Sequence, residues 1–346
     1  MKSSGIQRVT AKDIARAVGV SPAAVSYVLS GCGREKGIGA ETCKRVTDAA
    51  ARLGYRPNTL AKGLRQGRSR LIGVLAPCVT FGYFSEIVRG AEDIASARGY
   101  TVILMHSDED AEKEAQKIET LRRYSVEGLL VIPAIVRGHA VSFAALLGDH
   151  LPFVLVDKTV KGVEGHFVGT DDRAGARTLV EHLIGLGHRR IAHLRGPRGI
   201  STSEDRLAGY RDALRAAGIR LDPRWVAGDE WSEEAGRAAT RQLLAVSPRP
   251  TAIFAGTDLG AWGAYDVFVE AGLRVPQDIS LAGFADLSPS ARLAVPLTTV
   301  RQPARDVGRR AGEKLVNLIE TGEDEPREVR LPTELVVRAS TGMVCT

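Results

Sequence analysis

Apolar residues recur at helical spacing early in this chain and in short uninterrupted runs later. The early positions are Ile14, Ala15, Val18, Val25, Val28 and Leu29. A period near 3.6 residues predicts amphipathic helices whose apolar faces pack on one another. The later runs alternate with helical stretches, which predicts βαβ units with parallel strands. We therefore expect a small all-helical unit followed by a larger α/β unit.

Two short helices joined by a tight turn are predicted near the N-terminus. Thr10 and Asp13 form a variant of the capping box, and Gly19 can end the first helix in a left-handed conformation. Ser21 is a suitable N-cap, and Pro22 suits the first helical position. Such a pair forms a helix-turn-helix, whose second helix enters the major groove of DNA. Small residues at the start of that helix let its backbone approach base edges closely.

A third helix is expected at Ala40–Leu53, ended by Gly54. The loop before it, GCGREKGIG, is basic and suited to phosphate contact, but the chain has no GxxxxGK[ST] nucleotide-binding loop. The segment TLAKGLRQGRSR follows and has few apolar residues to bury. It is either a linker that becomes helical with a partner or a flexible basic tether.

Charge is unevenly distributed along the chain. Residues 1–70 contain 14 Lys/Arg and 4 Asp/Glu, a balance of +10, whereas the remaining residues carry a balance of −4. A basic region of this size is the electrostatic signature of a protein that binds a polyanion. A disordered basic arm is the alternative, and the helical pattern argues against it.

Length and cysteine usage narrow the class of protein. At 346 residues the chain should hold two or three compact units. No apolar run approaches the roughly 18 residues of a membrane span, and the first residues lack the apolar core of a secretory signal. The cysteines are scattered and form no CxxC pair: Cys32, Cys43, Cys78 and Cys345. This fits a reducing cytoplasm and argues against a zinc site or a disulfide framework.

Short apolar runs predict the strands of the α/β unit. The expected strands are Leu71–Leu75, Val102–Met105, Gly128–Ile132, Phe153–Val156, Ile191–Leu194, Ala252–Phe254 and Ile279–Ala282. Helices are expected between them, for example at Glu86–Arg98 and Glu112–Tyr124. Two such sheets side by side leave a cleft at the carboxyl ends of their strands, which is the expected position of a ligand.

Motifs for catalysis and metal binding are missing from the sequence. The seven histidines show no HExxH and no metal-ligand spacing, and there is no GxSxG. His182 and His188 flank a helix end and are expected to be structural. We expect no enzyme activity, no cofactor and no metal, because an enzymatic role would rest on fold analogy alone.

A series of segments, in order and spacing, resembles the LacI/GalR family of bacterial transcription regulators. They are VTAKDIARAVGVSPAAVSYVLSG, ETCKRV, GYRPN, LAKGLRQGRS, LIGVLAP, ARGYTVILMHSDED, VEGLLVIPA, HLIGLGHRRIAHLRGP, EDRLAGYRDALRAAGI, FAGTDLGAWGA, DISLAGFADL and PLTTVRQP. The resemblance implies an all-α helix-turn-helix headpiece and an α/β core of two doubly wound parallel-sheet subdomains, similar to periplasmic binding proteins. The implied boundaries are a headpiece at 1–55, a hinge helix or linker at 56–70, and a core at 71–346 whose subdomains cover about 71–170 with 302–331 and about 171–301 with 332–346.

The resemblance also implies the DNA-contacting residues. They are Thr10, Ser21, Pro22, Ala23, Ser26, Tyr27, Tyr55, Asn58, Ala61 and Leu64. Pro22, Ala23 and Tyr27 match base-facing positions, and Leu64 matches a hinge leucine that wedges into the minor groove and bends the duplex. Leu64 could instead be a helix-packing residue, although its neighbours offer nothing to pack with. Tyr27 stands where the family usually has Arg, which binds guanine bidentately, so a familiar operator sequence is not expected.

The effector-binding residues are implied in the same way. They are Tyr83, Phe84, Asp157, Arg206, Trp231, Thr257 and Asp286. Three of them have structural alternatives, since Asp157 could cap a turn, Trp231 could be core and Arg206 could form a surface ion pair. Ala285 and Thr257 stand where the family usually shows Asp and Asn, which removes polar partners of a sugar. A pentose or hexose is the default ligand, and a sugar phosphate, a sugar acid or another metabolite stays open.

The resemblance implies a cytoplasmic, nucleoid-associated DNA-binding regulator, in most cases a repressor, controlled by a small metabolite. It would bind a pseudopalindromic operator as a homodimer. A dimer is expected rather than a tetramer because the chain ends about ten residues after its last apolar strand, Leu335–Val337. The alternative is a solute-binding protein of a transporter, which would need a signal peptide and no headpiece. Release of DNA and promotion of its binding by the effector are both compatible with the sequence.

Overall fold

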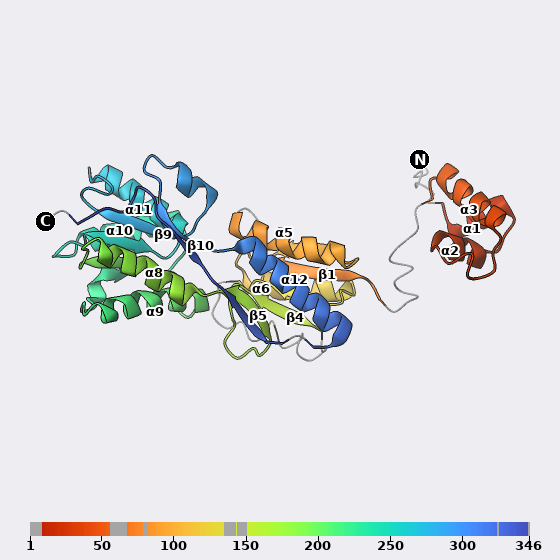
Figure 1. Ribbon diagram of the computed structural model, residues 1–346, viewed down its shortest axis with the longest axis horizontal. Coiled ribbons are helices and arrows are strands. Elements are labelled where there is room, and N and C mark those ends of the chain that lie inside the picture. Colours follow the sequence, from red (N-terminus) through yellow and green to blue (C-terminus); the bar gives the residue numbers. More distant parts are fainter. Residues whose placement is uncertain are drawn as a thin grey trace. The chain divides into compact units, whose positions relative to one another are not determined.

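The chain folds into two compact units, Met1–Ser69 and Arg70–Thr346, in the computed structural model (Figure 1). The structure describes residues 9–55, 68–78, 82–134, 143, 151–323 and 325–344. Most of the expected hinge lies outside the described residues, as do Asn58, Ala61, Leu64 and Cys345. What the sequence predicts for these residues stays a prediction.

Three helices form the first unit: α1 (Ala11–Val18), α2 (Pro22–Leu29) and α3 (Ala40–Arg52). Their apolar faces meet in one small core, in which Ile14, Val25 and Val46 are completely buried. The predicted helix-turn-helix is confirmed. The third helix ends one residue earlier than expected, with Leu53 as its C-cap.

Local side-chain chemistry sets the ends of α1 and α2. The Asp13 carboxylate accepts hydrogen bonds from the hydroxyl of Thr10 at 2.7 Å and from its N–H at 2.9 Å, and these bonds lower the pKa of Asp13. Gly19 ends α1 with a left-handed φ of 75°. The Ser21 hydroxyl oxygen accepts from the N–H of Ala24 at 3.1 Å and caps α2. These contacts lie within a few residues of each other, which is why the sequence alone predicts them.

Two six-stranded sheets form the second unit. The first has the order β11-β5-β4-β3-β1-β2, and each neighbouring pair is parallel. Its strands are β1 (Leu71–Ala76), β2 (Thr101–His106), β3 (Leu129–Val131), β4 (Phe153–Val156), β5 (His166–Thr170) and β11 (Glu328–Leu331).

The second sheet has the order β12-β10-β9-β8-β6-β7. Its pairs are parallel except for β12, which runs antiparallel to β10. Its strands are β6 (Ile191–Leu194), β7 (Val226–Ala227), β8 (Ala252–Ala255), β9 (Ser280–Ala285), β10 (Thr298–Arg301) and β12 (Glu334–Val336).

The seven strands expected from apolar runs all form, with small shifts at their ends. The last apolar strand, expected at Leu335–Val337, forms as β12 one residue earlier. The remaining four described strands were not expected, namely β5, β7, β10 and β11. β11 has the sequence EVRL, which alternates charged and apolar residues at a sheet edge, and β7 has two residues. Neither presents an apolar run, so their pairing depends on the neighbouring strand.

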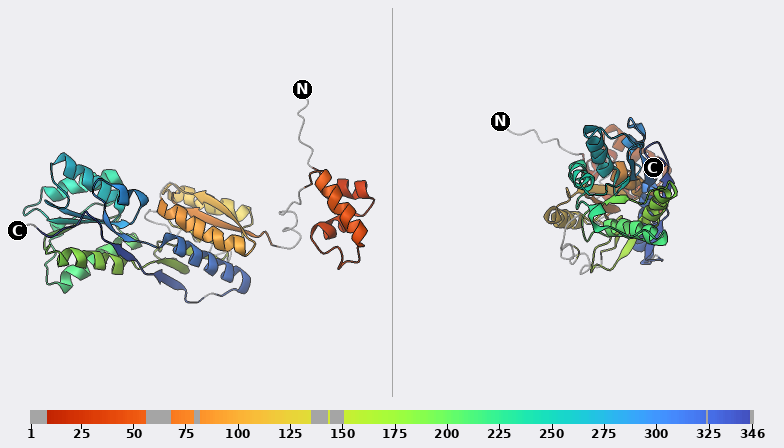
Figure 2. Two further views of the ribbon diagram at one scale, coloured as in Figure 1. Left: turned by 45° about the horizontal axis from the view of Figure 1, so that its top comes forward. Right: turned by 90° about the vertical axis from the view of Figure 1, so that its left-hand side faces the viewer.

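Helices cover both faces of each sheet, as Figures 1 and 2 show. α5 and α12 pack on one face of the first sheet and α6 on the other, while α8 and α9 lie opposite α10 and α11 on the second. Their bounds are α5 (Gly82–Ala97), α6 (Ala111–Arg123), α8 (Asp172–Gly185), α9 (Ser201–Ala216), α10 (Glu233–Leu244), α11 (Asp258–Glu270) and α12 (Ala304–Thr321). This arrangement confirms the expected fold class of two doubly wound α/β subdomains.

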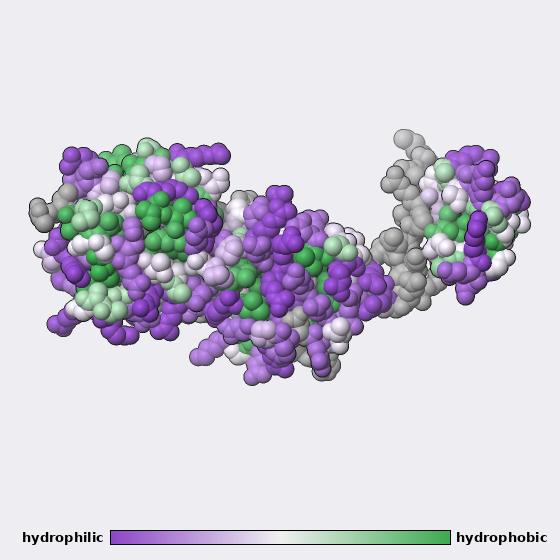
Figure 3. Space-filling model, viewed as in Figure 1, coloured by the Kyte–Doolittle hydropathy of each residue, from purple (hydrophilic) through white to green (hydrophobic). Residues whose placement is uncertain are grey.

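The chain passes between the two sheets at residues 170–172, 301–304 and 331–334. α12 follows a strand of the second sheet but packs on the first. The space-filling view shows hydrophilic side chains interspersed with smaller hydrophobic patches on one face of the molecule (Figure 3). Among the described helices, none combines the length and the apolar character needed to cross a membrane.

Candidate functional site: a helix-turn-helix surface and an effector cavity

The second helix of the headpiece presents its predicted DNA-reading side to solvent. Pro22 and Ala23 are exposed, Ser26 is half-buried, and the large aromatic side chain of Tyr27 is 43% exposed. Val25, on the opposite side of α2, is completely buried. The burial of one side leaves the other free for a partner. The contacts of these residues with DNA stay a prediction.

The remaining described DNA candidates differ in their surroundings. Thr10 and Ser21 are exposed at the starts of α1 and α2, where both take part in capping. The N–H and the hydroxyl of Thr10 both donate to Asp13, whereas the Ser21 hydroxyl accepts from the N–H of Ala24 and can still donate its hydrogen to a phosphate oxygen. Tyr55 is half-buried and packs against the helical core. Its side chain therefore has a structural role besides the predicted phosphate contact.

A cavity of about 670 Å³ opens in the second unit between elements of both sheets. It lies where strands end, since Asp157 follows β4, Thr257 follows β8 and Ala285 ends β9. Six of the seven predicted effector residues line it: Tyr83, Phe84, Asp157, Arg206, Trp231 and Thr257. The cleft expected at the carboxyl ends of the strands is thus present.

Asp286, the seventh predicted effector residue, is not part of the described lining of the cavity, and its effector role stays a prediction. Its carboxylate accepts hydrogen bonds from Arg301 at 2.8 Å and from Arg338 at 2.6 Å. Its backbone adopts φ 55°, and Ala285 before it adopts φ 125°. This turn brings Ala285 and Leu287 to the cavity while Asp286 pairs with the two arginines.

Arg206 is the most strongly constrained cation of the cavity. It is 4% exposed, and its Nε and Nη2 lie 2.9 and 2.8 Å from Oδ2 of Asp172, which is 1% exposed. Its Nη1 donates to the carbonyl of Gly256 at 2.6 Å. The guanidinium lies 4.6 Å from the ring centroid of Trp231 and 4.0 Å from that of Phe284. The ion pair is therefore buried, and not the surface pair that the sequence left open.

Tyr83, Asp157 and Gln302 form a second hydrogen-bonded set along the cavity. Tyr83 and Asp157 belong to the first subdomain, and Gln302 lies on a connection between the sheets. The Tyr83 hydroxyl donates to Asp157 at 2.8 Å, and Gln302 donates to Tyr83 at 3.2 Å and to Thr170 at 2.8 Å. Gln302 Oε1 lies 3.5 Å from Nη2 of Arg206. Burial and the nearby Asp157 raise the pKa of Tyr83, so the phenol stays a neutral donor. Both subdomains are thus joined by one hydrogen-bonded chain along the cavity.

Sequence reasoning missed several residues of this site. Gln302, Lys158 and Thr202 line the cavity, and Asp172 holds Arg206. Asp172 begins α8 directly after one crossing between the sheets, and Gln302 lies in another crossing, so no local pattern in the sequence marks them. Burial raises the pKa of Asp172, and the adjacent Arg206 opposes that effect.

Thr257 and Asp258, at the start of α11, have different surroundings: Thr257 faces the cavity and Asp258 is buried. The Thr257 hydroxyl oxygen accepts from the N–H of Gly260 at 3.1 Å and faces the cavity. Asp258 is completely buried and accepts from the hydroxyls of Ser290 and Thr299 at 2.6 Å. Asp258 also accepts from a backbone N–H at 2.8 Å. Its carboxylate is fully used inside the protein, which supports the structural role expected for it.

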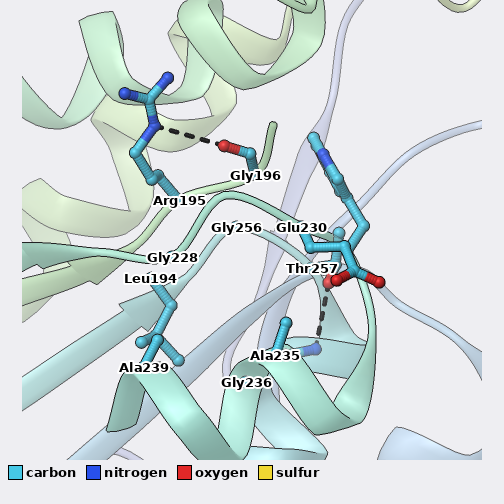
Figure 4. A pocket seen from close by; sticks show the side chains of 12 residues that line it. Leu194, Arg195, Gly196, Gly228, Glu230, Ala235, Gly236, Ala239, Gly256 and Thr257 are labelled. Carbon is cyan, nitrogen blue, oxygen red and sulfur yellow. Dashed lines mark hydrogen bonds between the residues drawn. The ribbon is translucent and has the colours of Figure 1, made fainter. Parts of the chain in front are cut away.

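A smaller hollow of about 10 Å³ lies beside the main cavity (Figure 4). Its walls come largely from glycine backbone, including Gly196, Gly228 and Gly256, together with Glu230 and Thr257. A volume of this size holds about one water molecule. Since Thr257 and Glu230 line both spaces, the hollow is a side recess of the main cavity.

His182 and His188 form hydrogen bonds inside the second subdomain, as expected for structural residues. His188 contacts the hydroxyls of Thr251 and Ser280 at 2.9 and 3.0 Å, and His182 contacts Thr341 at 3.1 Å. Burial lowers the pKa of both histidines. Within the described residues, no group of three or more His, Cys, Asp or Glu side chains could hold a metal ion.

His193 makes the stability of the second unit depend on pH. Burial lowers its pKa to about 3, whereas an unfolded His has a pKa of about 6.5. The residue is neutral in both states at pH 7, but below pH 6.5 the unfolded chain binds a proton that the folded chain excludes. We expect this residue to cost up to about 1.4 kcal/mol of stability per pH unit as the pH falls from 6.5 toward 3.

The measurement is the melting temperature of the wild type and of His193→Gln at pH 7 and pH 5. Glutamine stays neutral, and its amide can still donate to the carbonyl of Phe254, which His193 contacts at 3.0 Å. At pH 7 the variant should melt at a lower temperature than the wild type. Between pH 7 and pH 5 its melting temperature should fall by less than that of the wild type. Equal losses in the two proteins would show that His193 does not control this dependence.

Comparison with known proteins gives two family matches. Residues 10–58 match the bacterial regulatory proteins of the lacI family, and residues 180–341 match the periplasmic binding protein-like domain. The first match covers the helix-turn-helix and the second covers most of the second sheet with its helices. Together they cover the DNA-reading surface and one wall of the cavity.

Relatives of known role match nearly the whole chain. The chain is 32% identical to the ribose operon repressor of Haemophilus influenzae over 331 residues, which is 96% of this chain and 98% of the relative. It is 31% identical to the HTH-type transcriptional repressor PurR of Photobacterium profundum over 331 residues, again 96% and 98%. The lac repressor dimer bound to operator and the anti-inducer ONPF has a TM-score of 0.86 and 30% identity, covering 97% of this chain and 100% of that one. The chain therefore belongs to the LacI family of bacterial regulatory proteins and is a DNA-binding transcription regulator with a small-molecule effector site.

Proposed function

We propose that this protein is a repressor that binds a pseudopalindromic operator as a homodimer and changes its affinity for DNA when a neutral, hydroxyl-rich metabolite enters the cavity. The observation that carries the proposal is the chain of polar groups from Asp157 through Tyr83 and Gln302 to Arg206 along one cavity. The ribose operon repressors and the operator-bound lac repressor dimer among its relatives support it. Its place of action would be the bacterial cytoplasm, on the nucleoid.

The lining suits a sugar or a related polyol. Tyr83, Phe84 and Trp231 offer aromatic faces, and Asp157 and Gln302 offer oxygen and amide groups within the same cavity. A sugar has one apolar face of C–H groups and a rim of hydroxyls, so it can use both kinds of contact at once. Tyr83 and Asp157 already form a donor–acceptor pair at 2.8 Å, which a ligand hydroxyl can join.

Charge in the described lining favours a neutral ligand over an anionic one. Arg206 is paired with Asp172, Lys158 lies 3.9 Å from Glu109, and Arg237 lies within hydrogen-bonding distance of Asp266. The lining carboxylates are Glu109, Asp157, Glu230, Glu233 and Glu234. A phosphate or carboxylate ligand would meet these acids and would have to compete for cations that are already paired. We therefore expect a neutral sugar as the effector rather than a sugar phosphate or a sugar acid.

Effector binding can be coupled to DNA affinity because residues of both subdomains line the cavity. Tyr83 and Asp157 belong to the first sheet and its helices, whereas Arg206, Trp231 and Thr257 belong to the second. A ligand that contacts both sides binds the closed arrangement of the subdomains more tightly than an open one. By linkage it shifts the population toward that arrangement, and DNA affinity changes with it. A transport-related binding protein would have no use for the exposed helix-turn-helix.

A thermal-shift screen of the full chain tests the effector class. The panel contains neutral pentoses, hexoses and disaccharides, their phosphates, sugar acids and nucleobases. A ligand at 100 times its Kd should stabilise the protein by about 2.7 kcal/mol, and the hit is expected among the neutral sugars. Hits confined to phosphates or acids would contradict the neutral class, and a panel without a single hit would contradict a sugar-type effector. DNA binding is tested separately, by selection of bound sequences from random duplexes.

A further inference from the structure

The loop between α2 and α3 is folded into a compact structure. The N–H of Cys32 donates to the carbonyl of Tyr27 at 3.0 Å, and the N–H of Lys36 donates to the carbonyl of Cys32 at 3.1 Å. The N–H of Ile38 closes the loop on the carbonyl of Gly33 at 3.0 Å. The loop is therefore tied to the backbone of Tyr27, one of the exposed residues of the predicted DNA-reading helix.

The loop is also packed against both neighbouring helices. Gly33 is buried, and a Cβ at this position would lie 3.2 Å from Cα of Val28 and 3.1 Å from Sγ of Cys43. Cys43 on α3 in turn donates to the carbonyl of Ile38 at 3.6 Å. These distances are shorter than most Cβ contacts, so a larger residue would have to displace its neighbours, and the loop is closely packed at this point.

This packing places a lysine over the tyrosine. The Nζ of Lys36 lies 5.9 Å from the ring centroid of Tyr27, within the range of a cation–π interaction. Both side chains are exposed, as are Pro22 and Ala23 on the same helix. Among these four side chains, only Lys36 carries a positive charge.

We propose that Lys36 is a specificity-determining residue that supplies the cation missing from position 27 of the DNA-reading helix. A tyrosine hydroxyl cannot bind the O6 and N7 acceptors of guanine as a cationic side chain does, whereas lysine can. The ring of Tyr27 holds the ammonium group at the edge of the helix that faces the bases. The expected result is a preference for a G·C pair at one position of each half-site. This inference rests on the DNA-binding function of the headpiece.

A phosphate contact is the competing role for Lys36, and it has a different signature. Phosphate contacts strengthen binding to every sequence and steepen its salt dependence, but they carry no base preference. Arg34 provides the matched control, because it is exposed in the same loop and carries the same charge. Within the described residues, the structure shows no aromatic ring under its guanidinium.

The experiment is selection from random DNA duplexes by the full chain, with sequencing and affinity measurement of the selected sites. The wild type, Lys36→Ala, Lys36→Arg and Arg34→Ala are compared. Lys36→Ala should lose about 10-fold or more of the preference for one G·C pair, while the other positions keep theirs. Lys36→Arg should retain the preference, and Arg34→Ala should weaken binding to all sites alike. Tyr27→Ala should reproduce the loss seen with Lys36→Ala.

Two results would overturn the proposal: the first concerns Lys36 alone, and the second is a failure of the general DNA-binding function. If Lys36→Ala selects the same motif as the wild type, at equal or uniformly lower affinity, Lys36 does not read a base. If the wild type itself enriches no motif, sequence-specific binding fails and the role of Lys36 fails with it. Because Lys36 is exposed, its variants should melt at the wild-type temperature, which verifies that any loss arises at the DNA.

Discussion

Replacing Arg206 with alanine should lower the free energy of unfolding of the second unit by about 3–5 kcal/mol, since removal of one partner leaves a buried charge uncompensated. Asp172, which would lose its cation, is 1% exposed. Urea denaturation of the wild type and of Arg206→Ala measures the difference. The same variant loses the guanidinium that lines the cavity, so it should also lose the thermal shift caused by the compound identified in the ligand screen.

A second variant separates the two effects. Arg206→Met combined with Asp172→Asn removes both charges and keeps the side-chain volumes similar, so most of the stability should return. The double variant should still show no ligand-induced shift, and its headpiece should bind DNA as before. A ligand response equal to that of the wild type would exclude Arg206 from the effector site.

The chain contains a matched control for this ion pair. Arg173 and Asp212 join the same two helices, α8 and α9, at 2.6 Å, but the Arg173 side chain is 59% exposed. Arg173→Ala should therefore cost less than about 1 kcal/mol and leave the ligand response intact. A large loss in this variant would mean that any disturbance of the α8–α9 pair destabilises the fold, irrespective of the cavity.

Replacing Gly308 with alanine should destabilise the first subdomain by about 3 kcal/mol or more, because extra volume in a packed contact forces the backbone apart. Gly308 lies on α12, and a Cβ there would overlap the carbonyl oxygen of Ile87 on α5. Gly90 on α5 makes the reciprocal approach to the carbonyl of Arg305. With backbone on both sides, no side chain can rotate away to make room.

The measurement is the urea midpoint of Gly308→Ala, with Gly82→Ala as its control. Gly82 begins α5, and a Cβ added there would point into open space, so its substitution should change stability by no more than about 1 kcal/mol. A midpoint for Gly308→Ala equal to that of the wild type would contradict direct backbone contact between α5 and α12. Stability is measured rather than DNA affinity, because Gly308 lies in the second unit and DNA is bound by the headpiece.

The sequence was sufficient for the headpiece and for most strands, since their signals are local. The Thr10–Asp13 contact, the left-handed Gly19 and the Ser21 cap all act within a few residues of each other. Apolar runs such as FVLV at β4 mark strands that are buried on both faces. The resemblance to the LacI/GalR family implied the effector residues, and six of them line one cavity: Tyr83, Phe84, Asp157, Arg206, Trp231 and Thr257.

Tertiary structure decided which side chains meet, and the reason is the separation of the partners along the chain. Arg206 and Asp172 lie on different helices, and Gln302 reaches them from a connection between the two sheets. No periodicity links such positions, because strand order and the three crossings bring them together. Asp286 looks like a cavity residue by its place after β9, but the turn there directs its carboxylate to Arg301 and Arg338. The sequence alone thus determined the local elements and the family, whereas only the packed fold determined the buried network, the direction of each polar group and the approach of Lys36 to Tyr27.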